Sequence, residues 1–231
     1  MNMIASLLLP LLISSSFVLQ RPAEQQARAS AVFRSFHDSL QSLRRETPMK
    51  ANKETENESD IAESLTNIAD YVKFLEAVFA SDKPVPDEFL EGVALDAELL
   101  QRIANRETKF HPELQLYDKL KDLEADLAIK VTNNRGGGDI ARVVQVFVRA
   151  KKGDQDVSAY EIWCTPKAWE FDAQHRRRFD KLTNLSNPSS MTLSPGRYYF
   201  WLTKERSESE HKLINIGVNG ELKQEIDLVV P

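Results

Sequence analysis

Histidine, cysteine and acidic side chains are the residues of this chain that could do chemistry, and their spacing limits which reactions are open to it. No histidine has another three or four positions away, so the chain lacks a zinc-ligand pattern. Cys164 is the only cysteine and has no histidine close in sequence, so we expect a small buried residue rather than a nucleophile. The four histidines are His37, His111, His175 and His211.

Carboxylate and glycine clusters give equally little support to catalysis. Asp154 and Asp156 in a turn, with Asp139, lack the alternating oxygen ligands of calcium loops, so a solvated hairpin is favoured. Gly136–Gly138 is followed by a β-branched run rather than a helix, which favours a hairpin loop over a phosphate cradle. The Gly-x-Ser-x-Gly pattern of many hydrolases is also missing. We therefore expect no catalytic residue, no metal ion and no cofactor, and an unrecognised hydrolase is the least favoured alternative.

Two surface features remain, and the first is basic. Arg176, Arg177 and Arg178 are consecutive, so they cannot all point inward and part of the run must form a basic surface. Such a surface suits anionic glycans, lipid headgroups or the acidic helices of the same chain. A solvated loop without a partner is the simplest interpretation of the run.

The second feature is an aromatic strand. Ser194-Pro195-Gly196 predicts a tight turn in which Gly196 can take a positive φ, and the strand 197–203 follows. Its side chains alternate between two faces, and both faces are rich in large apolar groups. One face must line a core, and we expect the helical region to cover the other. The alternative is a platform for a sugar or a peptide, formed by Tyr199, Trp201, Trp163 and Trp169.

The first half of the chain has helical periodicity. An apolar stripe predicts a helix over residues 22–46, and a polar stretch at 47–58 predicts a linker. A regular a/d seam follows Ser59, the expected N-cap, and at this length such a seam is more often an internal core than an intermolecular coiled coil. Prolines then separate two further helices. The four apolar sets are Phe33, Phe36, Leu40 and Leu43; Ile61, Leu65, Ile68, Val72, Leu75 and Phe79; Phe89, Val93, Leu99, Leu100 and Ile103; and Leu116, Leu120, Leu123 and Leu127.

Near Leu127 the period changes to that of strands, and Ala128–Thr132 is expected to be the first of them. Asn219-Gly220 is a strong signal for a two-residue hairpin. Several short strands between turn signals favour an antiparallel sandwich. The later strands are expected at 143–148, 159–164, 197–203, 212–218 and 224–230.

The C-terminal half resembles a known group of domains. Tyr160-Glu161-Ile162-Trp163, the segment Leu193–Tyr198 and a closing strand at Glu225–Leu228 look like the PEGA and carboxypeptidase-regulatory-like domains. The resemblance covers about the last ninety residues, and the insert Lys167–Asn187 is longer than in a minimal example. It implies a prealbumin-like β-sandwich that serves as a non-catalytic accessory module and has no catalytic residues to carry over. The helical half resembles no family.

The N-terminus has the features of an export signal. Ile4–Leu19 is apolar except for a few serines and Pro10, and it is shorter than the ~20 residues that a membrane-spanning helix needs. Lysine and arginine are missing before it, which departs from the usual signal. We expect an exported protein, periplasmic or extracellular, without a stable membrane span after cleavage. The alternative is an uncleaved segment that tethers the protein to a membrane.

Charge is distributed unequally along the chain. Residues 21–126 hold 14 Lys and Arg against 22 Asp and Glu, a net charge of −8, whereas residues 127–231 hold 16 against 13, a net charge of +3. Neither half has the strongly basic character of a nucleic-acid-binding protein. The opposite signs favour contact between the two halves.

The sequence thus predicts an α+β protein: an N-terminal antiparallel helical bundle or hairpin, then a C-terminal antiparallel β-sandwich. The expected segments are a signal peptide at 1–20, a helical region at 21–126 and a sandwich at 127–231. The favoured function is non-catalytic binding of a protein or envelope component, and carbohydrate binding through the aromatic face is the alternative. The sequence does not indicate an oligomeric state.

Overall fold

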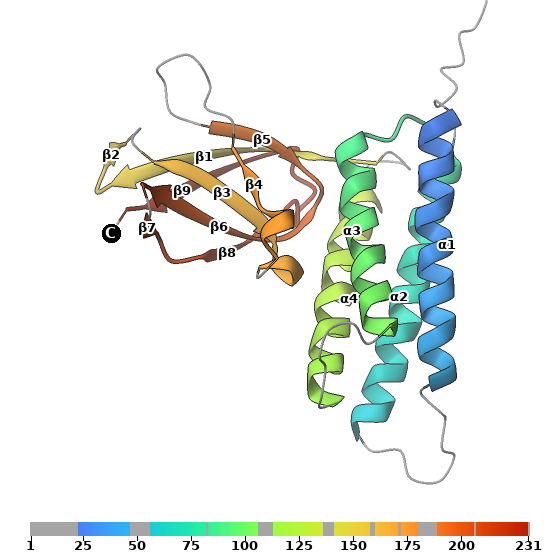
Figure 1. The fold of residues 1–231 in the computed structure, drawn as a ribbon. Coiled ribbons are helices and arrows are strands. Elements are labelled where there is room, and N and C mark those ends of the chain that lie inside the picture. The colour runs from blue at the N-terminus through green and yellow to red at the C-terminus, as the bar shows by residue number, and fades with distance from the viewer. Residues whose placement is uncertain are drawn as a thin grey trace, which may run out of the picture.

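The computed structural model describes residues 23–46, 56–81, 83–105, 113–135, 141–157, 160–170, 172–179, 189–205 and 207–230. Four helices stand beside two β-sheets, so the α+β architecture expected from the sequence is confirmed (Figure 1). The expected signal peptide, the glycine triplet and most of the expected linker lie outside the described residues.

Consecutive helices run antiparallel and form a four-helix bundle (Figure 1). Helices α3 and α4 lie on the side of the bundle that faces the sheets, and α1 and α2 lie behind them. The bounds are α1 Ala23–Glu46, α2 Glu56–Ala80, α3 Asp87–Ala104 and α4 Glu113–Arg135.

The apolar stripes of the four helices meet in one internal core. Every member of the a/d seam between Ile61 and Phe79 is buried, which confirms that this seam packs within the chain. The expected N-cap at Ser59 is wrong, because α2 begins at Glu56 and Ser59 lies inside the helix. Trp169, which follows the third strand, also belongs to this core, so the sheet half contributes to the packing of the bundle.

The change from helix to strand comes later than the sequence suggested. The segment Ala128–Thr132, expected as a strand, is the continuation of α4. Its β-branched residues favour a strand locally. In the structure, however, Lys130 and Val131 are buried inside the bundle and where the bundle contacts the sheets. Tertiary contacts therefore override the local preference.

The two sheets pack face to face around a second core. In the first sheet, the central strand β1 pairs antiparallel with β5 and β2, and parallel with β9. In the second, β6 pairs antiparallel with β3, β7 and β8, and β4 pairs with β3. The strands are β1 Val144–Lys152, β2 Gln155–Asp156, β3 Glu161–Pro166, β4 Arg177–Arg178, β5 Ser189–Leu193, β6 Gly196–Lys204, β7 Ser207–Glu208, β8 Lys212–Ile216 and β9 Lys223–Val229.

Two details of the sandwich differ from the expectation. The pairing of β9 with β1 is parallel rather than antiparallel. Asn219-Gly220 forms a turn, with Gly220 at φ +75°, but the strands that it connects belong to different sheets. The predicted two-residue hairpin is therefore wrong: this turn carries the chain from β8 across the sandwich to β9.

Strand β6 alternates as the sequence predicts. Tyr198, Phe200 and Leu202 point into the core between the sheets, where they are buried. The intervening side chains of Tyr199 and Trp201 therefore lie on the outer face of the second sheet.

The turn before β6 is the place where the sandwich meets the bundle. A Cβ added at Gly92, in the middle of α3, would lie 2.4 Å from both Cβ and Oγ of Ser194. Gly196 does not have the positive φ expected for it; a Cβ there would lie 3.6 Å from Nζ of Lys130 on α4. The turn is thus seated against two helices, and Gly92 is needed because a larger residue would push the layers apart.

Replacing Gly92 by Ala tests this close approach. Ala stabilises a helix by about 1 kcal/mol relative to Gly, yet the new Cβ must displace Ser194. We expect the free energy of unfolding to fall by about 1–3 kcal/mol, as measured by urea denaturation. Ser194→Gly removes the side chain that the new Cβ would meet, so G92A/S194G should recover most of the loss. Purely additive effects of the two substitutions would contradict the contact.

Candidate functional site

A row of alternating charges joins the sandwich to α4. Nζ of Lys167 lies 2.6 Å from Oδ1 of Asp122, and that oxygen lies 3.2 Å from a guanidinium nitrogen of Arg197. Nε of Arg197 donates to Oδ1 of Asp126 at 2.8 Å. Burial acts to lower the pKa of Arg197, but the two carboxylates outweigh it and raise that pKa. Two cations from the sandwich thus bind two anions of the acidic helical half.

A buried ion pair lies beside this row. Nζ of Lys130 on α4 is 2.9 Å from Oδ2 of Asp96 on α3, and the two side chains are only 4% and 11% exposed. Burial raises the pKa of Asp96 from its ordinary 3.8 to about 6, while the ammonium of Lys130 acts in the opposite direction. Removing one partner from such a pair typically costs about 3–5 kcal/mol. The pair therefore ties α3 to α4 directly beneath the turn that begins β6.

The end of α4 is held by two buried asparagines. Nδ2 of Asn133 donates to the carbonyl oxygen of Gly217 at 2.7 Å, which ties the helix to the turn after β8. Oδ1 of Asn134 accepts from the backbone N–H of Arg142 at 3.0 Å, just before β1. These bonds explain why α4 extends beyond the expected boundary. Its last turn is part of the contact between the bundle and the sandwich, which we call the junction.

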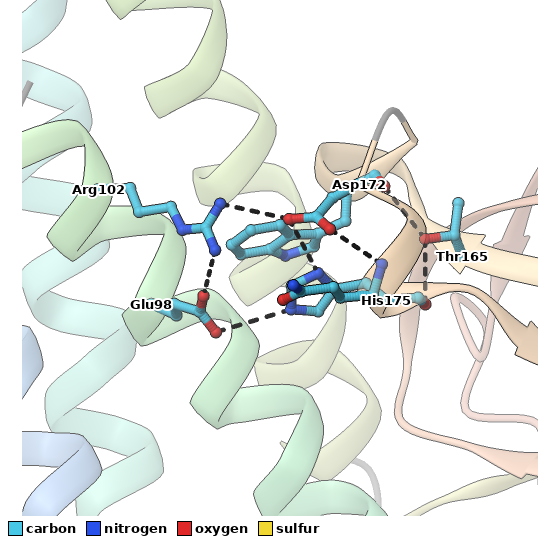
Figure 2. Close-up of polar contacts among 7 residues, drawn as sticks. Glu98, Arg102, Thr165, Asp172 and His175 are labelled. Carbon is cyan, nitrogen blue, oxygen red and sulfur yellow. Dashed lines mark hydrogen bonds and ion pairs between the residues drawn. The ribbon is translucent and has the colours of Figure 1, made fainter. Parts of the chain in front are cut away.

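Trp169 lies between a cation and an imidazole at the same junction. The guanidinium of Arg102 on α3 is 4.6 Å from the indole centroid, and the ring of His175 stacks at 4.1 Å. Arg102 also contacts Glu98 at 2.8 Å and Asp172 at 3.4 Å (Figure 2). A hydrogen bond from the backbone N–H of Gln174 lowers the pKa of Asp172, and His175 and Arg102 act in the same direction. We call Glu98, Arg102, Trp169, Asp172 and His175 the tryptophan clamp.

The tryptophan clamp contains a histidine and two carboxylates, but their geometry holds the structure together rather than activating a nucleophile. Nδ1 of His175 lies 3.4 Å from Asp172, and Nε2 lies 3.7 Å from Glu98. The nearby hydroxyl of Thr165 lies 3.3 Å from the carbonyl oxygens of Trp169 and His175 (Figure 2). Both ring nitrogens face carboxylates and the Thr165 hydroxyl faces carbonyls, so this hydroxyl is not paired with a base.

Trp201 has a similar environment on the outer face of the second sheet. The ring of His211 stacks on it at 4.5 Å, and the guanidinium of Arg176 lies 5.3 Å from its centroid. Glu170 and Glu208 hold these two covering residues at 3.2 Å each. Trp201 is 1% exposed as a result, so it presents no surface to a ligand.

The cover of this face differs from the expectation. We expected the helices to lie over it, but Trp201 is covered by Arg176 and His211, which belong to the sandwich. Helix α4 contacts β6 at its beginning, through Arg197. The sequence-based interpretation was therefore right that this face is used internally at Trp201, and wrong about which residues cover it.

Part of the expected aromatic surface is accessible. Trp163 and Tyr199 are half-buried, and Leu213, which pairs with Tyr199 across the strands, is 43% exposed. Nε1 of Trp163 donates to Oγ1 of Thr203 at 3.1 Å, which fixes the orientation of the indole. These three apolar side chains share the outer face of the second sheet, and we call them the outer aromatic face. Trp169, in contrast, is buried in the bundle core.

The three consecutive arginines separate and meet three different carboxylates. Arg176 binds Glu208, Arg177 binds Glu91 on α3, and Arg178 binds Glu161, with N–O distances of 3.2, 3.1 and 3.1 Å. They do not converge on one anion-binding position. Arg177 realises one of the expected alternatives, because its partner lies in the acidic helical half.

Burial makes Cys164 unreactive. The thiol is completely buried between the sheets, and burial raises its pKa to about 12. This agrees with its expected role as a small core residue. Across the described ranges, no three His, Cys, Asp or Glu side chains are grouped as a metal ion would require.

The charged residues that join the bundle to the sandwich were not expected from the sequence. Asp96 interrupts the apolar stripe between Val93 and Leu100, and Lys130 follows Leu127 on the buried side of α4. A charge on an apolar stripe is a signal for a buried pair, but it does not say which residue is the partner. Nothing in the sequence around Arg197 marked it as a residue that would pair with α4.

Comparison with known proteins places the chain in no family. No protein-family model matches the chain, and no curated protein matches it. Within the described residues, none of the helices is both long enough and apolar enough to cross a bilayer.

The pH dependence of folding tests the burial of Asp96. Because its folded pKa of about 6 lies above 3.8, the folded protein binds a proton between about pH 4 and 6 that the unfolded chain does not bind. The stability of the wild type relative to Asp96→Asn should therefore increase as the pH falls through this window. The expected slope is up to about 1.4 kcal/mol per pH unit. Urea titrations across this window measure the free energy of unfolding of both proteins. A wild type that loses stability relative to Asp96→Asn as the pH falls would contradict the assignment.

Proposed function

We propose that this is an exported, non-catalytic binding protein that recognises a protein or envelope component through the outer aromatic face. The observation that carries the proposal is the partial exposure of Trp163, Tyr199 and Leu213 on one sheet face. Apolar and aromatic side chains that stay accessible on a rigid sheet are typical of interaction sites.

The junction supports a binding role because it makes the sandwich a fixed support. Two sets of contacts connect the bundle to the sandwich: the row of alternating charges that includes Arg197 and Asp126, and the tryptophan clamp. The buried Lys130–Asp96 pair braces the helices beneath the sandwich. A ligand at the outer aromatic face would meet a surface that is already positioned. Binding then loses less free energy in ordering the protein.

The edges of this face are polar. Arg178 and Glu161 form an ion pair beside Trp163, and Asn215, two residues from Leu213 on the same face of β8, is exposed. Polar groups also lie between the apolar ones, because Arg176 and His211 cover Trp201, which pairs with Trp163 on this face. Protein-binding surfaces usually combine apolar side chains with polar ones. This favours a protein partner over a lipid surface.

A glycan is the second candidate partner. Indole and phenol rings offer flat apolar faces on which sugar rings stack, and Trp163 and Tyr199 are the partly exposed rings on this face.

Export from the cell, and the assignment of the sandwich to the PEGA and carboxypeptidase-regulatory-like group, belong to the same proposal. They rest on the apolar segment Ile4–Leu19 and on the motif of the aromatic strand.

Site-specific photo-crosslinking tests the protein partner. A photoreactive phenylalanine analogue in place of Leu213 should give a discrete adduct with another protein in intact cells. The same replacement at Ala77, exposed on α2, is the control. Tyr199→Ser should reduce the adduct at position 213 several-fold. Equal adducts at both positions, or none at position 213, would remove the outer aromatic face as the site.

Tryptophan fluorescence tests the glycan candidate. Oligosaccharides of several classes are titrated into the full chain, and binding at the outer aromatic face should quench or shift the emission. Trp163→Phe should abolish the change, since Trp169 and Trp201 are buried. An unchanged spectrum with every glycan class would exclude this candidate.

A further inference from the structure

The last described strand of the sandwich, β9, has one edge, which we call the open edge, along which no other described strand pairs. β9 pairs in parallel with β1 from Gln145 opposite Lys223 to Lys151 opposite Val229. Among the described residues it pairs with no other strand, so one of its two edges is without a partner strand. A row of backbone N–H and C=O groups along such an edge is a template for another strand.

The hydrogen bonds to β1 show which backbone groups remain available. The carbonyl oxygen of Leu222 accepts from the N–H of Gln145 at 2.9 Å, and the N–H of Val230 donates to the carbonyl of Lys151 at 2.7 Å. In a parallel ladder this places the even-numbered residues of β9 toward β1. The backbone groups of Lys223, Glu225, Asp227 and Val229 therefore point to the open edge.

Exposed apolar side chains gather on the same segment. Within the described residues, all four exposed large apolar side chains lie between residues 213 and 229. Two of them bracket β9: Leu222 is 58% exposed just before it, and Val229 is 70% exposed at its end. The strand contains no proline, and its inward side chains Ile226 and Leu228 are apolar, so these protections of natural edges are missing.

The charges of β9 complement a second copy of the same strand. Glu225 lies 3.0 Å from Arg149, and Asp227 lies 2.8 Å from Lys151. Antiparallel pairing about a two-fold axis at Glu225 places each Lys223 opposite Asp227 of the other copy. It also places the two Glu225 side chains opposite each other, each with its own Arg149.

We propose that the open edge of β9 pairs antiparallel with β9 of a second copy, so that two sandwiches share one continuous sheet. The backbone groups of Lys223, Glu225 and Asp227 exchange hydrogen bonds with their counterparts, and two Lys223–Asp227 pairs set the register. The pairing is self-complementary, which favours a second copy over an unrelated extended peptide. It uses a surface separate from the outer aromatic face.

Sedimentation equilibrium of the full chain tests the proposal, with Glu225→Pro as the first variant. Proline at this position removes an N–H that points to the open edge and leaves the ladder with β1 intact. The wild type should form dimers in a concentration-dependent manner, and E225P should be monomeric. The matched control E225A also loses the contact with Arg149 but keeps the N–H, so it should still dimerise. A monomeric wild type, or a dimer that survives in E225P, would overturn the proposal.

A charge series gives a second test that does not depend on proline. Lys223→Glu should weaken the dimer about tenfold, because two favourable cross-strand pairs become repulsive. Lys212→Glu makes the same charge change on exposed β8 and should leave the dimer unchanged. Adding Asp227→Lys to Lys223→Glu should restore most of the affinity. Equal weakening by both single variants, or no recovery in the double variant, would contradict this register.

Discussion

The close approach of the Ser194–Gly196 turn to α3 and α4 is the constraint on which the rest of the structure depends. Only a glycine fits opposite Ser194 on α3, and the same contact buries Lys130 with Asp96. A buried charge without a partner would cost several kcal/mol. The bundle and the sandwich are therefore restricted to one relative position, in which the layers touch and the charges pair.

This constraint explains why most of the conspicuous polar residues form contacts within the chain. Arg177 and His175 contact carboxylates on α3, and Arg176 covers Trp201 inside the sandwich. The side chains that stand out in the sequence for their charge or reactivity are thus largely engaged in internal contacts. The two binding surfaces that we propose consist of apolar side chains and of backbone groups at a strand edge, which composition and motifs describe poorly.

The helices could be predicted from the sequence because their cores follow a local period. The a/d seam between Ile61 and Phe79, and the alternation of Tyr198 with Tyr199, depend only on which residues must face inward. The end of α4 could not be predicted in this way. Ala128–Thr132 resembles a strand locally and is helical because Lys130, Asn133 and Asn134 find partners that come from distant parts of the chain. The candidate site was predicted in part: Trp163 and Tyr199 are accessible, whereas Trp201 and Trp169 are buried.

The sequence alone thus determined the order of the layers, the helix faces and the two faces of the aromatic strand, because each follows from a repeat of side chains along a few turns or strand residues. Only the tertiary structure decided which charges pair, which residues cover Trp201 and which strands are neighbours. The turn at Asn219-Gly220 shows why: its local geometry is that of a turn in any fold, but the partners of the strands on either side are chosen by packing. Pairing between distant residues leaves no periodic trace in the chain.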